Sequence, residues 1–358
     1  MRLKIVADAH VWGVEDAFAS FAGYDVDLNV LEAAHIDSHC LHDADVLISR
    51  SSVKINKTLL NDTKLRFVGT ATVGDDHVDQ GFLAAQGIEF ASAAGSSTAS
   101  VLEYMLSALL YMKQKKQWHW HEQTIGIIGV GRIGSAVASL AEQLGIHILL
   151  CDPPRMRQEN LNTFVSMQEV LEGADILTIH TPLQHDGLDA TWHLLNSKNI
   201  MCFQGHTLIN AARGGVLSQD ALLSWLNDSD DHGAILDCWE HEPNIAAQLL
   251  KHSGLLLGTA HIAGHSLDGK AANTYYVYQA LCAHLGVEPS WQPDLVDVSS
   301  SFKHVDHQMR YQDVMHCYDI EQDFVQLRRC AMLSSTQLAD QFKKIRRHYP
   351  VRRSWLTW

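Results

Sequence analysis

The sequence predicts an α/β fold with two doubly wound parallel-sheet domains and a small C-terminal α+β domain. The chain has 358 residues, which is more than one hydrophobic core usually serves. Short apolar runs alternate with helix-length segments in two successive blocks, and this alternation stops after about residue 286. Hydrophobic residues make up 46% of the chain, so each block has enough apolar material for its own core.

The first block ends at about residue 98. Its candidate strands are LKIVADA, DVLISR, LRFVGTATVG and IEFASAAG, with helix-length segments such as VDQGFLAAQG between them. Parallel β-α units are the simplest arrangement of this alternation. The next segment, SSTASVLEYMLSALLYMKQKKQ, begins with hydroxyl residues that can cap a helix, and its apolar positions recur at helical spacing. It predicts a long helix that connects the two blocks.

The second block, from residue 124 to about residue 264, repeats the alternation more regularly. It contains six short apolar runs: TIGIIGV, HILLCD, DILTIHTP, TLINAARGG, GAILDCWE and LLLGTAH. In open parallel sheets, ligands bind beyond the carboxyl ends of the strands. The chemistry is therefore expected at the residues that follow these runs: Asp152, Thr181, Arg213, Asp237, Glu242 and His261.

Three glycines in TIGIIGVGRIG, residues 124–134, fit the pattern G-x-G-x-x-G between a strand and a helix. In this pattern Gly129 permits the tight turn, Gly131 lets the backbone approach a pyrophosphate, and Gly134 lets the helix pack on the strand. Arg132 and Ile133 begin the helix, whose N-terminus favours negative charge. The pattern predicts a Rossmann-like dinucleotide site.

The identity of the dinucleotide depends on the end of the next strand. Asp152 lies 21 residues after Gly131, where a carboxylate can bind a ribose diol and repel a 2′-phosphate. We therefore expect NAD rather than NADP. Arg155 is close enough in sequence to read a phosphate instead.

Composition excludes several classes of partner. The net charge of -14 argues against a general nucleic-acid or anionic-membrane binder. No apolar run reaches the roughly 18 residues that a membrane span needs, and MRLKIVADAH is unlike a signal-peptide core, so a cytoplasmic protein is expected. The seven cysteines form no C-x-x-C pair and are expected to be reduced thiols that fill the cores.

The 22 histidines raise the question of a metal site. Their densest cluster is WHWHEQ, residues 118–123, but the chain has no H-E-x-x-H and no Cys/His pairing at zinc spacing. We therefore expect no metal, and a solvated linker at WHWHEQ.

The C-terminal block, residues 286–358, is predicted to be a dimerisation domain. A proline-bearing connection, GVEPSWQPDLVD, leads into it, and six Lys or Arg lie between residues 343 and 353 without an acid. This basic run is either a solvated or salt-bridged surface, or a source of arginines that approach the partner's substrate in a homodimer. The expected domains are 1–98 with 265–285 for substrate, 99–264 for NAD, and 286–358.

Several motifs together carry a family resemblance. The runs GIIGVGRIG, LLCDPPR, ILTIHTPL, LINAARGGVL, LDCWEHEP and TAHIAGHSLDGKA resemble, in order and spacing, those of the D-2-hydroxyacid dehydrogenase superfamily. Within it, DPPR, ISRSSVKIN, FVGTATVGDDHVD and the C-terminal block resemble the erythronate-4-phosphate dehydrogenase family of vitamin B6 biosynthesis. The resemblance implies NAD-dependent oxidation of a small phosphorylated 2-hydroxy acid, 4-phospho-D-erythronate, to its 2-oxo acid.

The same resemblance implies a role for three strand-exit residues. His261 matches the family's acid-base histidine, since a neutral imidazole can accept the substrate's hydroxyl proton. Glu242 matches its carboxylate partner, which stabilises the charged imidazole and holds the ring. Arg213 matches the arginine whose planar guanidinium binds the substrate carboxylate.

Other positions match the family's cofactor and substrate contacts. Asp237 matches the residue that holds the nicotinamide carboxamide. Where the family commonly has a tyrosine, this chain has His265. The resemblance implies cofactor contacts at Thr181 and Gly264, and substrate contacts at Ser51, Thr72 and His265.

Two alternatives to this function stay open at the level of sequence. One is another D-2-hydroxyacid or phosphoglycerate dehydrogenase. The other is a non-catalytic, NAD-sensing protein like the corepressors that resemble this superfamily, although the acidic charge and the absence of long disordered tails weigh against it.

Overall fold

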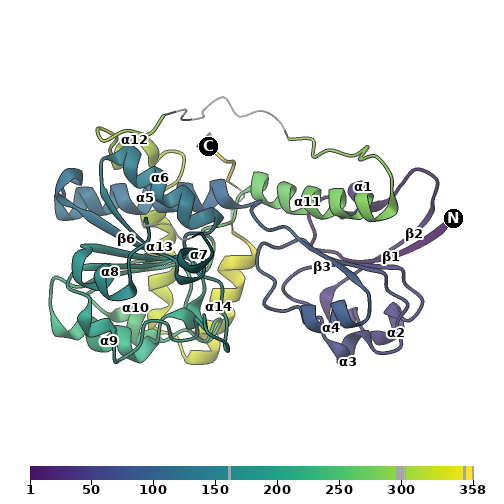
Figure 1. The fold of residues 1–358 in the computed structure, drawn as a ribbon, viewed down its shortest axis with the longest axis horizontal. Coiled ribbons are helices and arrows are strands. Elements are labelled where there is room, and N and C mark those ends of the chain that lie inside the picture. The colour runs from purple at the N-terminus through teal and green to yellow at the C-terminus, as the bar shows by residue number, and fades with distance from the viewer. Residues whose placement is uncertain (160–162, 296–301, 303, 350–351, 357–358) are drawn as a thin grey trace. The chain divides into compact units, whose positions relative to one another are not determined.

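The computed structural model describes residues 1–159, 163–295, 302, 304–349 and 352–356. The chain forms two compact units (Figure 1). Unit 1 comprises Met1–Ser97 with Ser266–Ser299, and unit 2 comprises Thr98–His265 with Ser300–Trp358. Each unit is built on a parallel sheet, which confirms the predicted α/β class.

Unit 1 contains a five-stranded parallel sheet in the order β2-β1-β3-β4-β5. Alternate residues of its strands enter two different cores, with Ile5 and Ile48 in one and Val6 and Leu47 in the other, so both faces of the sheet are covered. The strands are β1 (Arg2–Asp8), β2 (Asp25–Leu31), β3 (Val46–Ser49), β4 (Phe67–Thr70) and β5 (Glu89–Ser92). The helices are α1 (Val14–Phe18), α2 (Ser38–Leu41), α3 (Lys57–Leu60), α4 (Gln80–Ala85) and α11 (Leu267–Leu285).

Unit 2 contains a six-stranded parallel sheet in the order β11-β10-β9-β8-β6-β7. The order reverses at β6, and a single bridge from Leu150 to Phe164 extends the sheet beyond β7. All six predicted runs form strands: β6 (Thr124–Ile128), β7 (His147–Cys151), β8 (Ile176–Ile179), β9 (Thr207–Asn210), β10 (Gly233–Leu236) and β11 (Leu255–Gly258). The reversal at β6 is where ligands bind in such sheets.

Helices cover both faces of this sheet. In Figure 1, α5 and α6 lie on one side of it, and α8, α9 and α10 lie on the other. The helices of this part of the chain are α5 (Thr98–Lys116), α6 (Arg132–Leu144), α7 (Pro153–Glu159), α8 (Met167–Gly173), α9 (Gln219–Asp228) and α10 (Ala247–Lys251).

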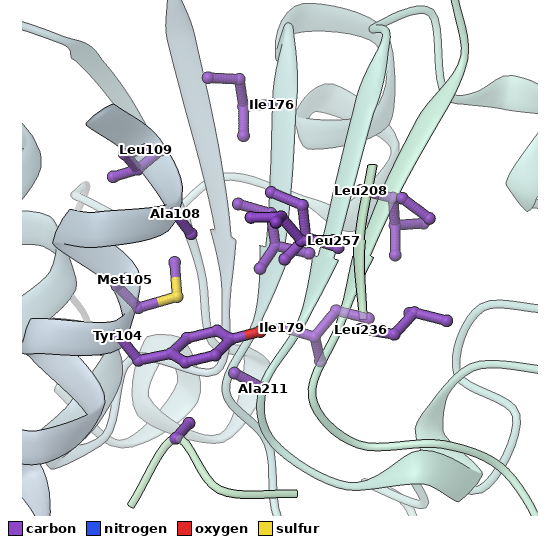
Figure 2. Packing of buried hydrophobic residues seen from close by; sticks show 14 of the residues in the cluster. Tyr104, Met105, Ala108, Leu109, Ile176, Ile179, Leu208, Ala211, Leu236 and Leu257 are labelled. Carbon is purple, nitrogen blue, oxygen red and sulfur yellow. The ribbon is translucent and has the colours of Figure 1, made fainter. Parts of the chain in front are cut away.

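Helix α5 is the predicted long helix, and residues 100–112 of it are buried throughout. Figure 2 shows Tyr104, Met105 and Ala108 facing the side chains of Ile179 and Leu236 from the sheet. No helix in the described part of the chain is long and apolar enough to cross a membrane.

The described helices of the C-terminal block belong to unit 2, whereas its first residues, 286–295, belong to unit 1. Its helices are α12 (Tyr311–Val314), α13 (Ile320–Arg328) and α14 (Ser335–Arg347). Phe324, Leu327, Phe342 and Trp355 join the core of unit 2 because these large apolar side chains have no separate core to enter. A separate small C-terminal domain is therefore not confirmed, and a role of this block in dimerisation stays a prediction.

Two smaller expectations need correction. His119 and His121 are exposed as expected of a linker, but Trp120 between them is only 3% exposed and packs in the core of unit 2. All seven cysteines are free thiols, yet only Cys151, Cys238 and Cys282 are buried, and Cys202 is exposed. Cys40, Cys317 and Cys330 are partly buried and pack against the cores, so the expectation fails only for Cys202.

Candidate active site

The glycine turn between β6 and α6 has the geometry that its sequence predicts. Gly129 has a φ of 84°, in the left-handed region that favours glycine. A Cβ on Gly134 would lie 2.0 Å from Gly129 O, so this position requires close packing of the helix on the turn. A Cβ on Gly131 would meet no atom within 4 Å, and no side chain caps the first turn of α6, which Arg132 and Ile133 begin. The turn therefore has free space beside Gly131 at a helix N-terminus, where anions bind.

Two buried polar atoms beside this turn lack partners. Thr181 Oγ1 and His180 Nδ1 have no hydrogen-bond partner among the described residues. A Cβ on Gly129 would come within 2.8 Å of Thr181 Cγ2, so Thr181 borders the glycine turn. Burial lowers the pKa of His180 to about 4, so its imidazole is neutral near pH 7. Buried hydroxyls normally have partners, and an unpartnered one at a glycine turn fits a dinucleotide ligand.

Asp152 follows β7 and is fixed by backbone groups. Its Oδ2 accepts a hydrogen bond from Val130 N at 2.8 Å, and its Oδ1 accepts one from Arg155 N at 3.0 Å. The Arg155 guanidinium is held by Glu159, with Nε 2.6 Å from Oε1, and it also donates to Val130 O. Because Arg155 is already ion-paired, the arrangement favours Asp152 as the group that reads the ribose.

His261 and Glu242 form a hydrogen-bonded pair. His261 Nδ1 lies 2.7 Å from Glu242 Oε2, and Trp239 N donates to Glu242 Oε1 at 2.7 Å. Burial opposes ionisation of Glu242, but His261, the Trp239 amide and the charge of Arg346 together lower its pKa below the usual value. Glu242 is therefore ionised near neutral pH and accepts from Nδ1–H, which leaves His261 Nε2 as the nitrogen that can exchange a proton.

Asp237 holds the turn that carries His261. It is 1% exposed, and its Oδ1 accepts hydrogen bonds from Thr259 Oγ1 and Ile262 N, both at 2.7 Å. Its Oδ2 accepts from Ala263 N at 2.9 Å, and its carbonyl accepts from His261 N at 2.9 Å. This scaffold supports a φ of 54° at His261, which is unusual for a residue with a side chain. The sequence indicated only a cofactor contact for Asp237.

Arg213 begins a turn that packs against the exit of β10. Asn210 Nδ2 donates to Arg213 O at 2.9 Å and to Cys238 O at 3.4 Å, so one buried amide ties the two exits together. A Cβ on Gly214 would lie 1.8 Å from Trp239 O, which shows how closely the turns approach. Since Trp239 also binds Glu242, this packing places the turn of Arg213 beside the segment that holds the His261–Glu242 pair. Sequence reasoning missed Asn210, although it too follows an apolar run.

Cys238, Glu242 and His261 place one potential metal-ligating atom each within 4.8 Å of one another. Burial, followed by the charges of Asp237 and Glu242, raises the pKa of the Cys238 thiol well above its usual value. His261 and Glu242 are already bonded to each other. We therefore interpret this cluster as an acid-base pair with a protonated thiol beside it.

Comparison with known proteins agrees with this arrangement. Residues 103–263 match the NAD binding domain of the D-isomer specific 2-hydroxyacid dehydrogenases. Over 333 residues, the chain is 40% identical to the erythronate-4-phosphate dehydrogenase of Hydrogenovibrio crunogenus, covering 91% of this chain and 86% of that protein. The chain belongs to the erythronate-4-phosphate dehydrogenase family. The Escherichia coli erythronate-4-phosphate dehydrogenase (strain SMS-3-5 / SECEC) is 37% identical over 360 residues, covering 99% of this chain and 92% of that protein.

Solved structures show the same fold at lower identity. The D-lactate dehydrogenase of Aquifex aeolicus, crystallised with NAD and lactic acid, superposes with a TM-score of 0.65 at 21% identity and covers 79% of this chain and 95% of that chain. The erythronate-4-phosphate dehydrogenase family is one of NAD-dependent dehydrogenases, and the glycine turn of unit 2 lies within its matched NAD binding domain.

The remaining residues expected from the family lie at two places. Ser51 and Thr72 each follow one of two neighbouring strands of unit 1, β3 and β4, and so lie at the same edge of that sheet. Thr72 Oγ1 donates to Gly74 O at 2.9 Å. Gly264 and His265 follow His261 in unit 2, where the His265 ring meets Tyr349 edge-on at 6.2 Å between centroids. His265 therefore packs on the C-terminal block.

Proposed function

We propose that the chain oxidises 4-phospho-D-erythronate to (R)-3-hydroxy-2-oxo-4-phosphooxybutanoate with NAD, in the biosynthesis of pyridoxine 5′-phosphate. The observation that carries the proposal is the hydrogen bond between His261 and Glu242, with the turn of Arg213 packed beside the exit of β10 at the carboxyl edge of the unit 2 sheet. The named relatives that share this fold over most of their length support the choice of substrate.

The chain's own residues supply proton transfer and anchoring. His261 Nε2 accepts the proton of the substrate's 2-hydroxyl group, while Glu242 stabilises the positive charge that forms on the ring. Arg213 binds the substrate carboxylate through two parallel N–H groups. When bound, NAD accepts the hydride from the carbon atom that carries the 2-hydroxyl group. In the reverse direction the charged His261 donates its proton to the ketone.

The residues around the glycine turn are proposed to hold NAD. Gly129, Gly131 and Gly134 shape the turn, and the amides at the start of α6 would meet the pyrophosphate. Asp152 would bind the ribose diol, and Thr181 would gain a partner for its buried hydroxyl.

A phosphorylated substrate is supported by two cations in unit 1. Burial and the neighbouring charge of Arg50 together lower the pKa of Lys270, which lies in the first turns of α11. Arg50 follows β3 directly before Ser51 and donates to His10 O at 3.1 Å. Two close positive charges near a helix N-terminus favour a dianion such as phosphate.

The proposal is tested by following NADH formation with four substrates: 4-phospho-D-erythronate, D-erythronate, 3-phospho-D-glycerate and D-lactate. Hydrazine in the assay traps the 2-oxo product. We expect the highest kcat/KM with 4-phospho-D-erythronate. A higher value with another acid would assign the chain a different substrate, and NAD binding without any turnover would indicate a sensing protein.

We also propose that the protein is a homodimer that associates through its C-terminal block. Four large apolar side chains of this block are exposed: Met315 at 40%, Val325 at 41%, Met332 at 83% and Leu333 at 36%. They are four of the ten large apolar side chains that are exposed in the described part of the chain, and exposed apolar surface is typical of an interface. Light scattering after size exclusion should give a dimeric mass that Met332→Asp with Leu333→Asp reduces to a monomeric one. A wild-type monomer would contradict the proposal.

A further inference from the structure

Arg352 is a buried arginine whose charge is paired within unit 2. Its Nη1 lies 2.9 Å from Glu103 Oε2, and the two side chains are 9% and 0% exposed. Its Nη2 donates to Ser100 O at 3.3 Å. Glu103 Oε1 in turn accepts hydrogen bonds from the amides of Trp355 and Leu356. The pair therefore fastens residues 352–356 to the first turns of α5.

The same guanidinium binds the turn that carries His261. Its Nε donates to His265 O at 3.1 Å, and its Nη2 donates to Ala263 O at 3.1 Å. Asp237 holds the turn through backbone amides, as described above. The segment 261–265 is thus bound through its amides by Asp237 and through its carbonyls by Arg352.

These contacts lie next to two of the three points at which the chain passes from one unit to the other. Unit 2 begins at Thr98, and its first segment ends at His265. Ser100 lies just after the first passage, and Ala263 and His265 lie at the second. One side chain therefore joins the two passages on the unit 2 side.

We propose that Arg352 is a positioning residue for the reaction, which fixes the turn 261–265 and thereby holds His261 Nε2 in register with the substrate hydroxyl. The inference rests on the proposed function. It requires arginine because the four acceptors lie around a planar group with five N–H donors, whereas a lysine has three on one atom. The left-handed backbone at His261 is unfavourable for a residue with a side chain, so the turn is expected to relax when Arg352 is removed.

A purely structural role makes a different prediction. Arg352→Ala leaves the carboxylate of Glu103 buried without its charge partner, which by itself destabilises the fold. The double variant Arg352→Ala with Glu103→Gln removes that charge and keeps an oxygen that accepts from Trp355 N. If Arg352 only neutralises Glu103, the double variant recovers both stability and activity. If Arg352 positions the turn, the double variant recovers stability alone.

The experiment compares full-length wild type, Arg352→Ala, Arg352→Lys, the double variant, and Arg347→Ala as an exposed arginine control from α14. Wild-type turnover of 4-phospho-D-erythronate is measured first, so failure of the proposed function is seen there, before any variant. We expect the double variant to have kcat lowered about 10-fold or more, the scale of a small misplacement of a catalytic group, with NADH affinity and thermal midpoint close to wild type. Arg347→Ala should match wild type.

A second readout needs no substrate. Hydrogen-deuterium exchange of the peptide that contains Ile262 and Ala263 should be faster in the double variant than in wild type. Added guanidinium ion at millimolar, non-denaturing concentration should slow this exchange and raise kcat in the double variant only. A double variant with kcat within about 3-fold of wild type, or with unchanged exchange at these amides, overturns the proposal.

Discussion

Arg213 is proposed to bind the substrate carboxylate with two N–H groups on one rigid plane. A lysine at this position keeps the charge but presents a single rotating ammonium group. We expect Arg213→Lys to lower kcat/KM by about 100-fold, the scale of losing one preorganised donor. Steady-state kinetics with 4-phospho-D-erythronate measure this loss, with NADH affinity as the control for an intact fold. A loss below about 3-fold would remove Arg213 from the mechanism.

The residues of the site were predictable where each follows an apolar run. Arg213, Glu242 and His261 all follow such runs, and the structure pairs His261 with Glu242 and packs the turn of Arg213 beside the exit of β10. The hydrogen bonds of Asp237 were not predictable, because a sequence does not show which atoms a carboxylate meets. Arg352 was seen only as part of a basic run, since its partner Glu103 lies 249 positions away.

At the scale of elements, two glycines of the turn between β6 and α6 have different roles. Gly134 is needed for packing of the helix, and Gly131 is expected to lie beside the cofactor. Gly131→Ala adds a methyl group to open space at a φ that alanine adopts readily, so we expect an unchanged thermal midpoint and weaker NAD binding. Gly134→Ala adds a methyl group 2.0 Å from Gly129 O, so we expect both weaker NAD binding and a lower thermal midpoint. Calorimetric NAD titration and thermal unfolding check both variants. Unchanged NAD affinity in Gly131→Ala would mean that the cofactor does not approach this turn.

Asp152, which directly follows β7, is expected to determine the preference for NAD over NADP. We expect Asp152→Ala to weaken NAD binding and to narrow the difference in affinity between NAD and NADP, because both the diol contact and the repulsion of a 2′-phosphate are lost. Arg155→Gln serves as the control, since the Arg155 guanidinium is bound by Glu159. If Arg155→Gln loses NADP binding and Asp152→Ala has no effect, then Arg155 rather than Asp152 distinguishes the two cofactors.

Sequence patterns predicted ten of the eleven strands that the described residues form, and missed β2 (Asp25–Leu31). This strand lies at the edge of the unit 1 sheet and is only partly buried, so acids and an asparagine alternate with its apolar residues. Buried strands produce a continuous apolar run, whereas an edge strand produces a weaker, mixed signal. In unit 2, β7 is also an edge strand and only partly buried, but after its first residue its run is apolar throughout, so it was recognised with the others.

For the whole molecule, Asp323 links stability to pH. Burial raises its pKa to about 6, against the opposing effects of Tyr349 and Arg352. The folded chain therefore binds a proton more tightly than the unfolded chain between about pH 4 and pH 6, and this group adds to the free energy of unfolding as the pH falls. When the pH falls from 7 to 5, we expect the free energy of unfolding of wild type to gain about 1 kcal/mol relative to that of Asp323→Asn.

Chemical denaturation of wild type and Asp323→Asn at both pH values measures this difference, because the other titrating groups are common to both proteins. Equal gains in the two proteins would show that Asp323 ionises normally in the folded chain.

The place of residues 300–358 could not be predicted, because it depends on the whole molecule. The proline-bearing connection and the change in pattern after residue 286 indicated a third domain. In the structure, the described helices of this block pack into the core of unit 2. A change of pattern marks where a new set of elements begins, but it does not show which core their apolar faces enter.

The pairing of Glu103 with Arg352 also affects how the chain is made. On the ribosome, α5 and the sheet of unit 2 emerge long before residue 352, and until then the ion pair of Glu103 with Arg352 cannot form. We therefore expect unit 2 to stay incomplete in nascent chains that stop short of the pair. Stalled chains in which residue 345 is the last to leave the ribosome should be cut by protease within residues 98–265, whereas chains that expose residue 356 should resist.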